Sequence, residues 1–175
     1  MMNVALYIAV SLDGFIADKD GGVGWLDAVA TESGEDYGYA EFYASVGALV
    51  MGRATYEQVR GFGDWPYPGK PSFVFSYAPP EGEHPNVTFV SGDPAEVVAS
   101  LRERIDGDLW LVGGGGLVAS FRAAGLIDAY ILSVIPVLLG EGIPLFESAQ
   151  PHTALPLVGA QSYASGVVQL RYAAG

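Results

Sequence analysis

The chain contains no cysteine and few basic residues. Without cysteine it can have no disulfide framework, no thiolate metal site and no cysteine nucleophile. Only eight Lys and Arg stand against 20 Asp and Glu, so the formal net charge is −12. Such a charge argues against nucleic acid and anionic membrane surfaces as partners, because both repel an acidic protein. A cytoplasmic location is the simplest expectation.

Long apolar runs and clustered histidines are also missing. Gly, Pro or charge interrupts every apolar run before the ~18 residues that a membrane span needs, and Asp13 comes too early for a signal peptide. His84 and His152 lie in polar, Pro-containing segments typical of loops, so we expect no metal site. Half of the residues are hydrophobic, which is enough to build the core of one domain over residues 1–175.

What the sequence does have is a run of glycines, Gly113–Gly116, between an apolar segment and a helix-like pattern. A strand that leads through glycines into a helix often binds phosphate, because the first helical N–H groups are unpaired and the helix dipole is positive there. A purely structural turn is the alternative. Leu117 and Val118 exclude the triphosphatase loop, and Val118 also occupies the third glycine position of the common dinucleotide fingerprint.

Apolar periodicity and turn signals predict strands that alternate with helices. The predicted strands span 4–10, 48–51, 72–76, 87–90, 108–112 and 129–135, and the predicted helices span 35–46, 55–60, 94–105 and 117–124. A closing hairpin is expected from 155–163 and 167–172. This order predicts an α/β fold, a three-layer α-β-α sandwich whose mostly parallel sheet is mixed because of the C-terminal antiparallel hairpin. Residues 18–25 form a loop in this prediction.

Three further motifs follow predicted strands, where ligands of open α/β sheets bind. They are Ser11-Leu12-Asp13-Gly14, Met51-Gly52-Arg53-Ala54-Thr55, and Gly125-Leu126-Ile127-Asp128 with Pro136 and Gly140-Glu141-Gly142 beyond it. With the glycine run, these motifs resemble the dihydrofolate reductase-like superfamily, and in particular the bacterial bifunctional deaminase-reductase C-terminal domain family, which includes the riboflavin-biosynthesis reductase. The resemblance implies a dihydrofolate reductase-like fold, NADPH as cofactor, hydride transfer to a pyrimidine- or pteridine-like heterocycle, and a homodimer, with an edge of the closing hairpin as its expected interface.

The resemblance also implies which residues bind NADPH. Gly113–Gly116 would receive the pyrophosphate, and the family often has a cis peptide bond between the first two of these glycines. Arg53 and Thr55 would hold the adenosine-side phosphates, with Arg53 and Ser76 on the 2′-phosphate. An ion pair of Arg53 with Glu57 is the alternative. The full implied set is Ala9, Ile16, Gly52, Arg53, Thr55, Ser76, Val112, Gly113, Gly114, Gly115, Gly116, Leu117 and Val118.

The implied substrate residues are Asp13, Trp25, Asp36 and Tyr39. In dihydrofolate reductases an acidic residue fifteen positions before the Met-Gly-Arg methionine binds the pterin, and the matching position is Asp36. Asp36 is therefore the candidate catalytic carboxylate, and Ser133 resembles a hydroxyl that supports it. The alternatives are an acidic helix start for Asp36 and a turn residue for Asp13.

The sequence departs from the pattern of the riboflavin reductases in one respect, and this departure leaves the identity of the substrate undecided. Riboflavin reductases act on 5-amino-6-(5-phosphoribosylamino)uracil and typically offer arginines to its phosphate from the first helix. This chain has no Lys or Arg from 20 to 52. A phosphorylated substrate would be repelled there unless Lys19, Arg60 or Lys70 reaches over. Dihydrofolate reductase activity, and a nucleotide- or flavin-binding protein without turnover, are the alternative functions.

Overall fold

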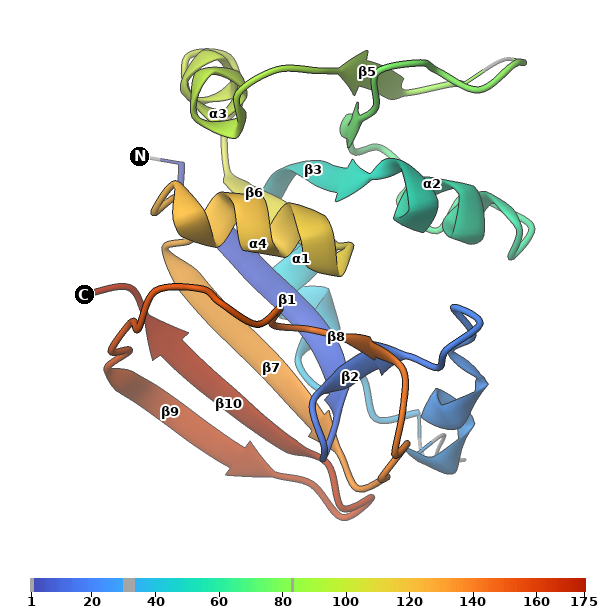
Figure 1. The fold of residues 1–175 in the computed structure, drawn as a ribbon, viewed down its shortest axis with the longest axis vertical. Coiled ribbons are helices and arrows are strands. Elements are labelled where there is room, and N and C mark those ends of the chain that lie inside the picture. The colour runs from blue at the N-terminus through green and yellow to red at the C-terminus, as the bar shows by residue number, and fades with distance from the viewer. Residues whose placement is uncertain (1, 30–33, 83) are drawn as a thin grey trace.

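An eight-stranded sheet runs through the computed structural model, which describes residues 2–29, 34–82 and 84–175 (Figure 1). Its strands are β1 (Val4–Ser11), β3 (Val46–Gly52), β4 (Ser72–Phe75), β5 (Val87–Val90), β6 (Asp108–Gly113), β7 (Ala129–Ile135), β9 (Leu157–Ser162) and β10 (Val168–Ala173). Their order is β5-β4-β3-β6-β1-β7-β10-β9, and only the two pairs that involve β10 are antiparallel. The predicted mostly parallel mixed sheet with a closing hairpin is confirmed.

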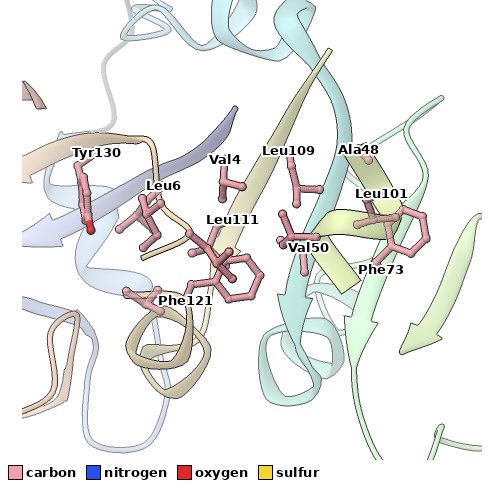
Figure 2. Close-up of a cluster of buried hydrophobic side chains, with 14 of the residues drawn as sticks. Val4, Leu6, Ala48, Val50, Phe73, Leu101, Leu109, Leu111, Phe121 and Tyr130 are labelled. Carbon is pink, nitrogen blue, oxygen red and sulfur yellow. The ribbon is translucent and has the colours of Figure 1, made fainter. Parts of the chain in front are cut away.

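Helices pack on both faces of this sheet (Figure 1). They are α1 (Tyr39–Ser45), α2 (Arg53–Arg60), α3 (Pro94–Arg102) and α4 (Gly115–Ala123). Leu101 of α3 and Phe121 of α4 join Leu6 and Leu111 in one apolar cluster (Figure 2). Residues of α1 and α2 form a second cluster around Trp110. Because side chains alternate along a strand, β1 sends Leu6 to the first cluster and Tyr7 to the second.

Short elements were not predicted. A two-stranded sheet pairs β2 (Phe15–Ala17) with β8 (Ile143–Pro144), and a 3₁₀ helix, η1, spans Gly24–Val29 inside and beyond the expected loop. Elements this short carry no readable periodicity. The predicted helix over 35–46 begins only at Tyr39, because Gly38 before it adopts a left-handed φ of 78°. None of the helices in the described ranges has the length and apolar character that a membrane crossing requires.

The outer edge of the sheet is β9, which pairs with β10 alone. Its side chains of Leu157 and Val158 are exposed. An open edge of this kind is a common place for a second chain to pair. A homodimer through this hairpin edge stays a prediction.

The Ser-Leu-Asp-Gly motif ties two distant segments together. The Ser11 hydroxyl donates to Asp13 Oδ1 at 2.6 Å, and the Asp13 carboxylate accepts from the backbone N–H groups of Leu139 and Gly140 at 3.1 and 2.7 Å. Asp13 therefore holds the connection between β7 and β8, and with it the position of β8 beside β2. This contact agrees with the turn-residue interpretation of Asp13.

The same contacts predict an acid-sensitive link. The Ser11 hydroxyl, and then the N–H groups of Gly140 and Leu139, lower the pKa of Asp13 below its ordinary 3.8. A carboxyl whose folded pKa is depressed adds stability above its unfolded pKa and loses it as the pH falls through the folded pKa. We expect Asp13→Asn to flatten the loss of unfolding free energy below about pH 4, measured by urea denaturation over a pH series. The exposed Asp64→Asn is the control, and equal pH dependence in both variants would contradict the assignment.

Candidate active site

Two helices begin at the same place in the sheet. Strand β3 ends at Gly52, which is the N-cap of α2, and the neighbouring β6 ends at Gly113, one residue before Gly114, the N-cap of α4. Neither start receives a side-chain cap from the described residues, so the first N–H groups of both helices are available to a ligand. A Cβ on Gly114 would lie 3.3 Å from Thr55 Oγ1, which shows how closely the two starts approach.

The glycine run enters this junction through an irregular strand end. Val50 pairs with Leu111 but Met51 pairs with Gly113, so Val112 is an extra residue in β6. Gly113 and Gly114 then turn the chain with φ values of 146° and 96°, which favour glycine. The peptide bond between them is trans, which corrects the cis bond implied by the family resemblance. Two successive positive φ angles make the turn without it.

A cleft of about 980 Å³ opens at the junction. Most of the residues predicted for the cofactor line it: Ala9, Ile16, Gly52, Arg53, Thr55, Val112, Gly113, Gly114, Gly115, Gly116 and Leu117. Val118 does not, because its side chain is fully buried in the core and its N–H donates to the Gly114 carbonyl at 2.9 Å. Its predicted contact is therefore wrong. Ser76 lines an adjoining hollow of about 400 Å³ that shares Gly52 and Gly116 with the cleft.

Arg53 forms the ion pair with Glu57 that the sequence offered as the alternative, and its role toward phosphate stays a prediction. Its Nε donates to Glu57 Oε1 at 2.8 Å, one turn along α2, and its Nη1 donates to the Ala78 carbonyl at 3.0 Å. The side chain is nevertheless half-exposed and lines the cleft. These two contacts hold the guanidinium beside the start of α2. Ser76 donates its hydroxyl to the same Ala78 carbonyl at 2.8 Å, so it lies next to Arg53.

Aromatic residues that sequence reasoning mostly missed line the cleft, and together they are called the aromatic wall. Its members are Tyr7, Trp25, Phe62, Tyr67 and Trp110. The Trp110 indole donates to the Tyr7 carbonyl at 3.0 Å and meets the Tyr67 ring edge-on at 5.3 Å. Only Trp25 was predicted. The available signal was that Tyr7 shares a strand face with Ala9, two residues further along.

Burial raises the pKa of the Tyr7 and Tyr67 hydroxyls, so both stay protonated at neutral pH. The Tyr7 hydroxyl donates to the Tyr37 carbonyl at 3.3 Å, an acceptor that it shares with the Gln169 amide at 3.0 Å. The wall is therefore uncharged, and its Tyr7 and Trp110 donors are already used within the chain.

The structure places Asp36, the predicted substrate carboxylate, outside the cleft. Asp36 is exposed and does not line the cleft, because its two oxygens accept from the N–H groups of Gly38 and Ala40 at 3.0 Å each. These bonds, that to Ala40 first, lower the Asp36 pKa. The helix-start alternative therefore describes Asp36, and its predicted place beside the heterocycle is corrected.

Ser133 and Tyr39 also lie outside the cleft lining. Ser133 is buried in β7 and accepts from the Gln169 amide at 3.3 Å, without contact to Asp36. Tyr39 packs edge-on against the Tyr7 ring, with the two ring centroids 6.2 Å apart, so it supports the wall from behind. Asp13 holds the connection to β8 and does not line the cleft either.

The loop predicted over residues 18–25 forms one rim of the cleft. Asp18 Oδ1 accepts from the N–H groups of Asp20 and Gly22 at 2.9 and 2.7 Å, which braces the turn internally. The Gln58 amide of α2 donates to the Gly21 carbonyl. The loop is thus tied to the helix whose start faces the ligand.

Comparison with known proteins identifies the family of this chain. The sequence model of the RibD C-terminal domain matches residues 3–169. The chain belongs to the RibD C-terminal domain family. The uncharacterized protein YwjB of Bacillus subtilis (strain 168) is 40% identical to it over 171 residues, which is 97% of each chain.

Solved structures agree with this family. A putative riboflavin biosynthesis protein from Shewanella sp. PV-4 superposes with a TM-score of 0.90 at 33% identity, covering 100% of this chain and 99% of that one. Dihydrofolate reductase from Enterococcus faecalis, solved with NADP(H), superposes with a TM-score of 0.71 at 19% identity, covering 99% and 96%. The RibD C-terminal domain and dihydrofolate reductase thus share this fold, as the sequence motifs predicted.

The RibD-type glycine run contains two neighbours with opposite tolerance for a side chain. A Cβ on Gly115 would lie 2.8 Å from the Pro144 carbonyl oxygen of β8, whereas one on Gly116 would lie 3.7 Å from Glu147 Oε1, an ordinary contact. We expect Gly115→Ala to lower the free energy of unfolding by about 1–3 kcal/mol. Gly116→Ala should leave it unchanged or raise it by up to ~1 kcal/mol, because alanine favours helix. Chemical denaturation measures both, and similar losses would contradict the predicted packing against β8.

Proposed function

We propose that the chain is an NADPH-dependent reductase that transfers hydride to a pyrimidine- or pteridine-like heterocycle, as the riboflavin-biosynthesis reductases of its family do. The observation that carries the proposal is the meeting of two uncapped helix starts with Arg53 at one cleft, beside an aromatic wall. The helix starts and Arg53 suit a phosphorylated dinucleotide, and the aromatic wall suits a flat ring.

The residues of the cleft fit the cofactor. The N–H groups of Gly115, Gly116 and Leu117, at the start of α4, would hold the pyrophosphate. Thr55 would add a hydroxyl from the start of α2. A guanidinium has five N–H donors, and the Nε and Nη1 contacts of Arg53 leave several for the 2′-phosphate. A side chain on Gly114 would press against Thr55, which is consistent with the backbone itself being the binding surface.

The bound nicotinamide would supply the hydride. The protein would orient the two rings and exclude water between them. Ala9 and Ile16 line the cleft between the glycines and the aromatic wall along β1 and β2, where their backbone groups can meet the nicotinamide amide. Trp25 and Tyr7 would position the heterocycle through contacts with their ring faces.

The acidic residues of the cleft distinguish between the alternative functions, which are dihydrofolate reductase activity and nucleotide or flavin binding without turnover. The only acidic residue that lines the cleft within the described ranges is Asp20, at the rim. With Asp36 committed to α1, the pterin-binding carboxylate of dihydrofolate reductases has no counterpart in the cleft. This arrangement favours the riboflavin-type reductase over dihydrofolate reductase activity, and it also suits a nucleotide- or flavin-binding protein without turnover.

Cofactor binding is tested by thermal shift with NADPH and NADH. We expect NADPH to stabilise the chain more strongly, because a ligand raises the melting temperature according to its affinity. Arg53→Ala should reduce NADPH affinity roughly tenfold, as expected from the loss of a charged hydrogen bond, with little effect on NADH. Arg104→Ala is the matched control, because its guanidinium contacts only the Ser100 carbonyl among the described residues. Equal shifts by both cofactors would refute the role of Arg53.

Catalysis is tested by following NADPH oxidation with dihydrofolate and with the riboflavin aminopyrimidine. We expect turnover of the aminopyrimidine and little of dihydrofolate, because the cleft lacks a carboxylate for the pterin. Saturable NADPH binding without oxidation across this panel would instead establish a binding protein.

A further inference from the structure

We infer that the aromatic wall takes a heterocycle that carries no phosphate ester, so that this chain acts on the dephosphorylated form of the substrate used by riboflavin reductases. The inference rests on the proposed reductase function and names the substrate class of the same cleft. It follows from where the basic residues, the acidic residues and one helix start lie around the wall.

Few basic side chains lie near the wall, and the guanidinium of Arg171, near Tyr7, already donates to the Gln169 side chain. The described ranges contain all eight Lys and Arg, and among these only Arg53 lines the cleft, at the helix starts. Lys19 pairs with Asp20 at 2.7 Å. The other two cations considered for a substrate phosphate are turned to other partners. Arg60 lies over the Tyr56 ring, 5.7 Å from its centroid, and the Lys70 ammonium donates to the Val46 carbonyl.

Helix α1 supports the wall from behind, and its start is closed to anions. Helix α1 packs against the wall through Phe42, whose ring stacks on Tyr7 with centroids 4.2 Å apart. Its first N–H groups, which otherwise suit a phosphate, already bind the carboxylate of Asp36. An external phosphate would have to displace a charge that is part of the chain.

Among the described residues, Asp20 is the one acidic residue that lines the cleft, and it pairs with Lys19 at the rim loop. A phosphate ester carries nearly two negative charges at neutral pH. Without a basic partner of its own at the wall, it would be repelled by the net charge of −12.

The wall instead suits a neutral ring with carbonyl groups. The Trp25 indole nitrogen is buried and has no hydrogen-bond partner among the described residues. A buried N–H without an acceptor is unfavourable, so a turn of the indole toward the cleft to meet a ring carbonyl oxygen would be stabilising. Aromatic faces stack on flat heterocycles of either form, so the discrimination comes from the phosphate.

The test compares 5-amino-6-ribosylaminouracil with its 5′-phosphate, using the full chain. Binding is measured by calorimetry in the presence of NADP⁺, and turnover by NADPH oxidation. We expect the unphosphorylated compound to bind on the order of tenfold more tightly, because like-charge contacts are costly. Added salt should reduce this difference in affinity between the two compounds, because it screens the repulsion of the phosphate. The Asp20→Asn substitution should also reduce the difference in affinity. The control substitution Glu103→Gln, remote from the cleft, should leave it unchanged.

The outcomes separate the two proposals. Equal or tighter binding of the phosphate ester, or no binding of either compound, overturns the inference. Turnover that favours the phosphate ester overturns it while leaving the reductase function intact. NADPH binding with no oxidation of either compound refutes the reductase function, and the binding preference then decides the inference by itself.

Discussion

The cleft depends on the parallel pairing of β3 with β6. Because Met51 lies opposite Gly113, both strands end at the same level, and the helices that follow must begin side by side. The next strand, β1, pairs with β6 and brings Tyr7 and Ala9 to the same opening. Neighbouring strands thus supply the two uncapped helix starts and part of the aromatic wall. A slip in the register of β3 and β6 would separate the two helix starts.

This arrangement lets a strongly acidic protein present an anion site. Most of the positive potential at the helix starts comes from backbone dipoles, which add nothing to the net charge. The single cation, Arg53, is held by Glu57 and the Ala78 carbonyl. Glu57 orients the guanidinium, but it also offsets part of the charge that a phosphate would feel. The affinity of the proposed cofactor would therefore reflect geometry more than charge.

The sequence predicted the junctions well because their signals are local. A short apolar strand, glycines and a helix pattern can be read without tertiary contacts, and the same holds for the closing hairpin. Asp36 was misplaced because counting back from Met51 assumes a continuous first helix. Gly38 delays that helix, and the carboxylate turns to its backbone instead. Tyr7 and Trp110 were missed because strand aromatics have the same pattern whether they fill a core or line a cleft.

The aromatic wall is core and binding surface at once. Trp110 and Tyr67 belong to the same buried cluster as Met51 and Tyr56, so the packing that stabilises the fold also fixes the rings that face the ligand. Burial of such side chains costs their rotamer freedom once, during folding, and none of it again on binding. A flat, neutral ring therefore meets a surface that is already in place. Among the described residues, the one long cation that lines the cleft is Arg53, and its contacts with Glu57 and the Ala78 carbonyl hold it beside the start of α2.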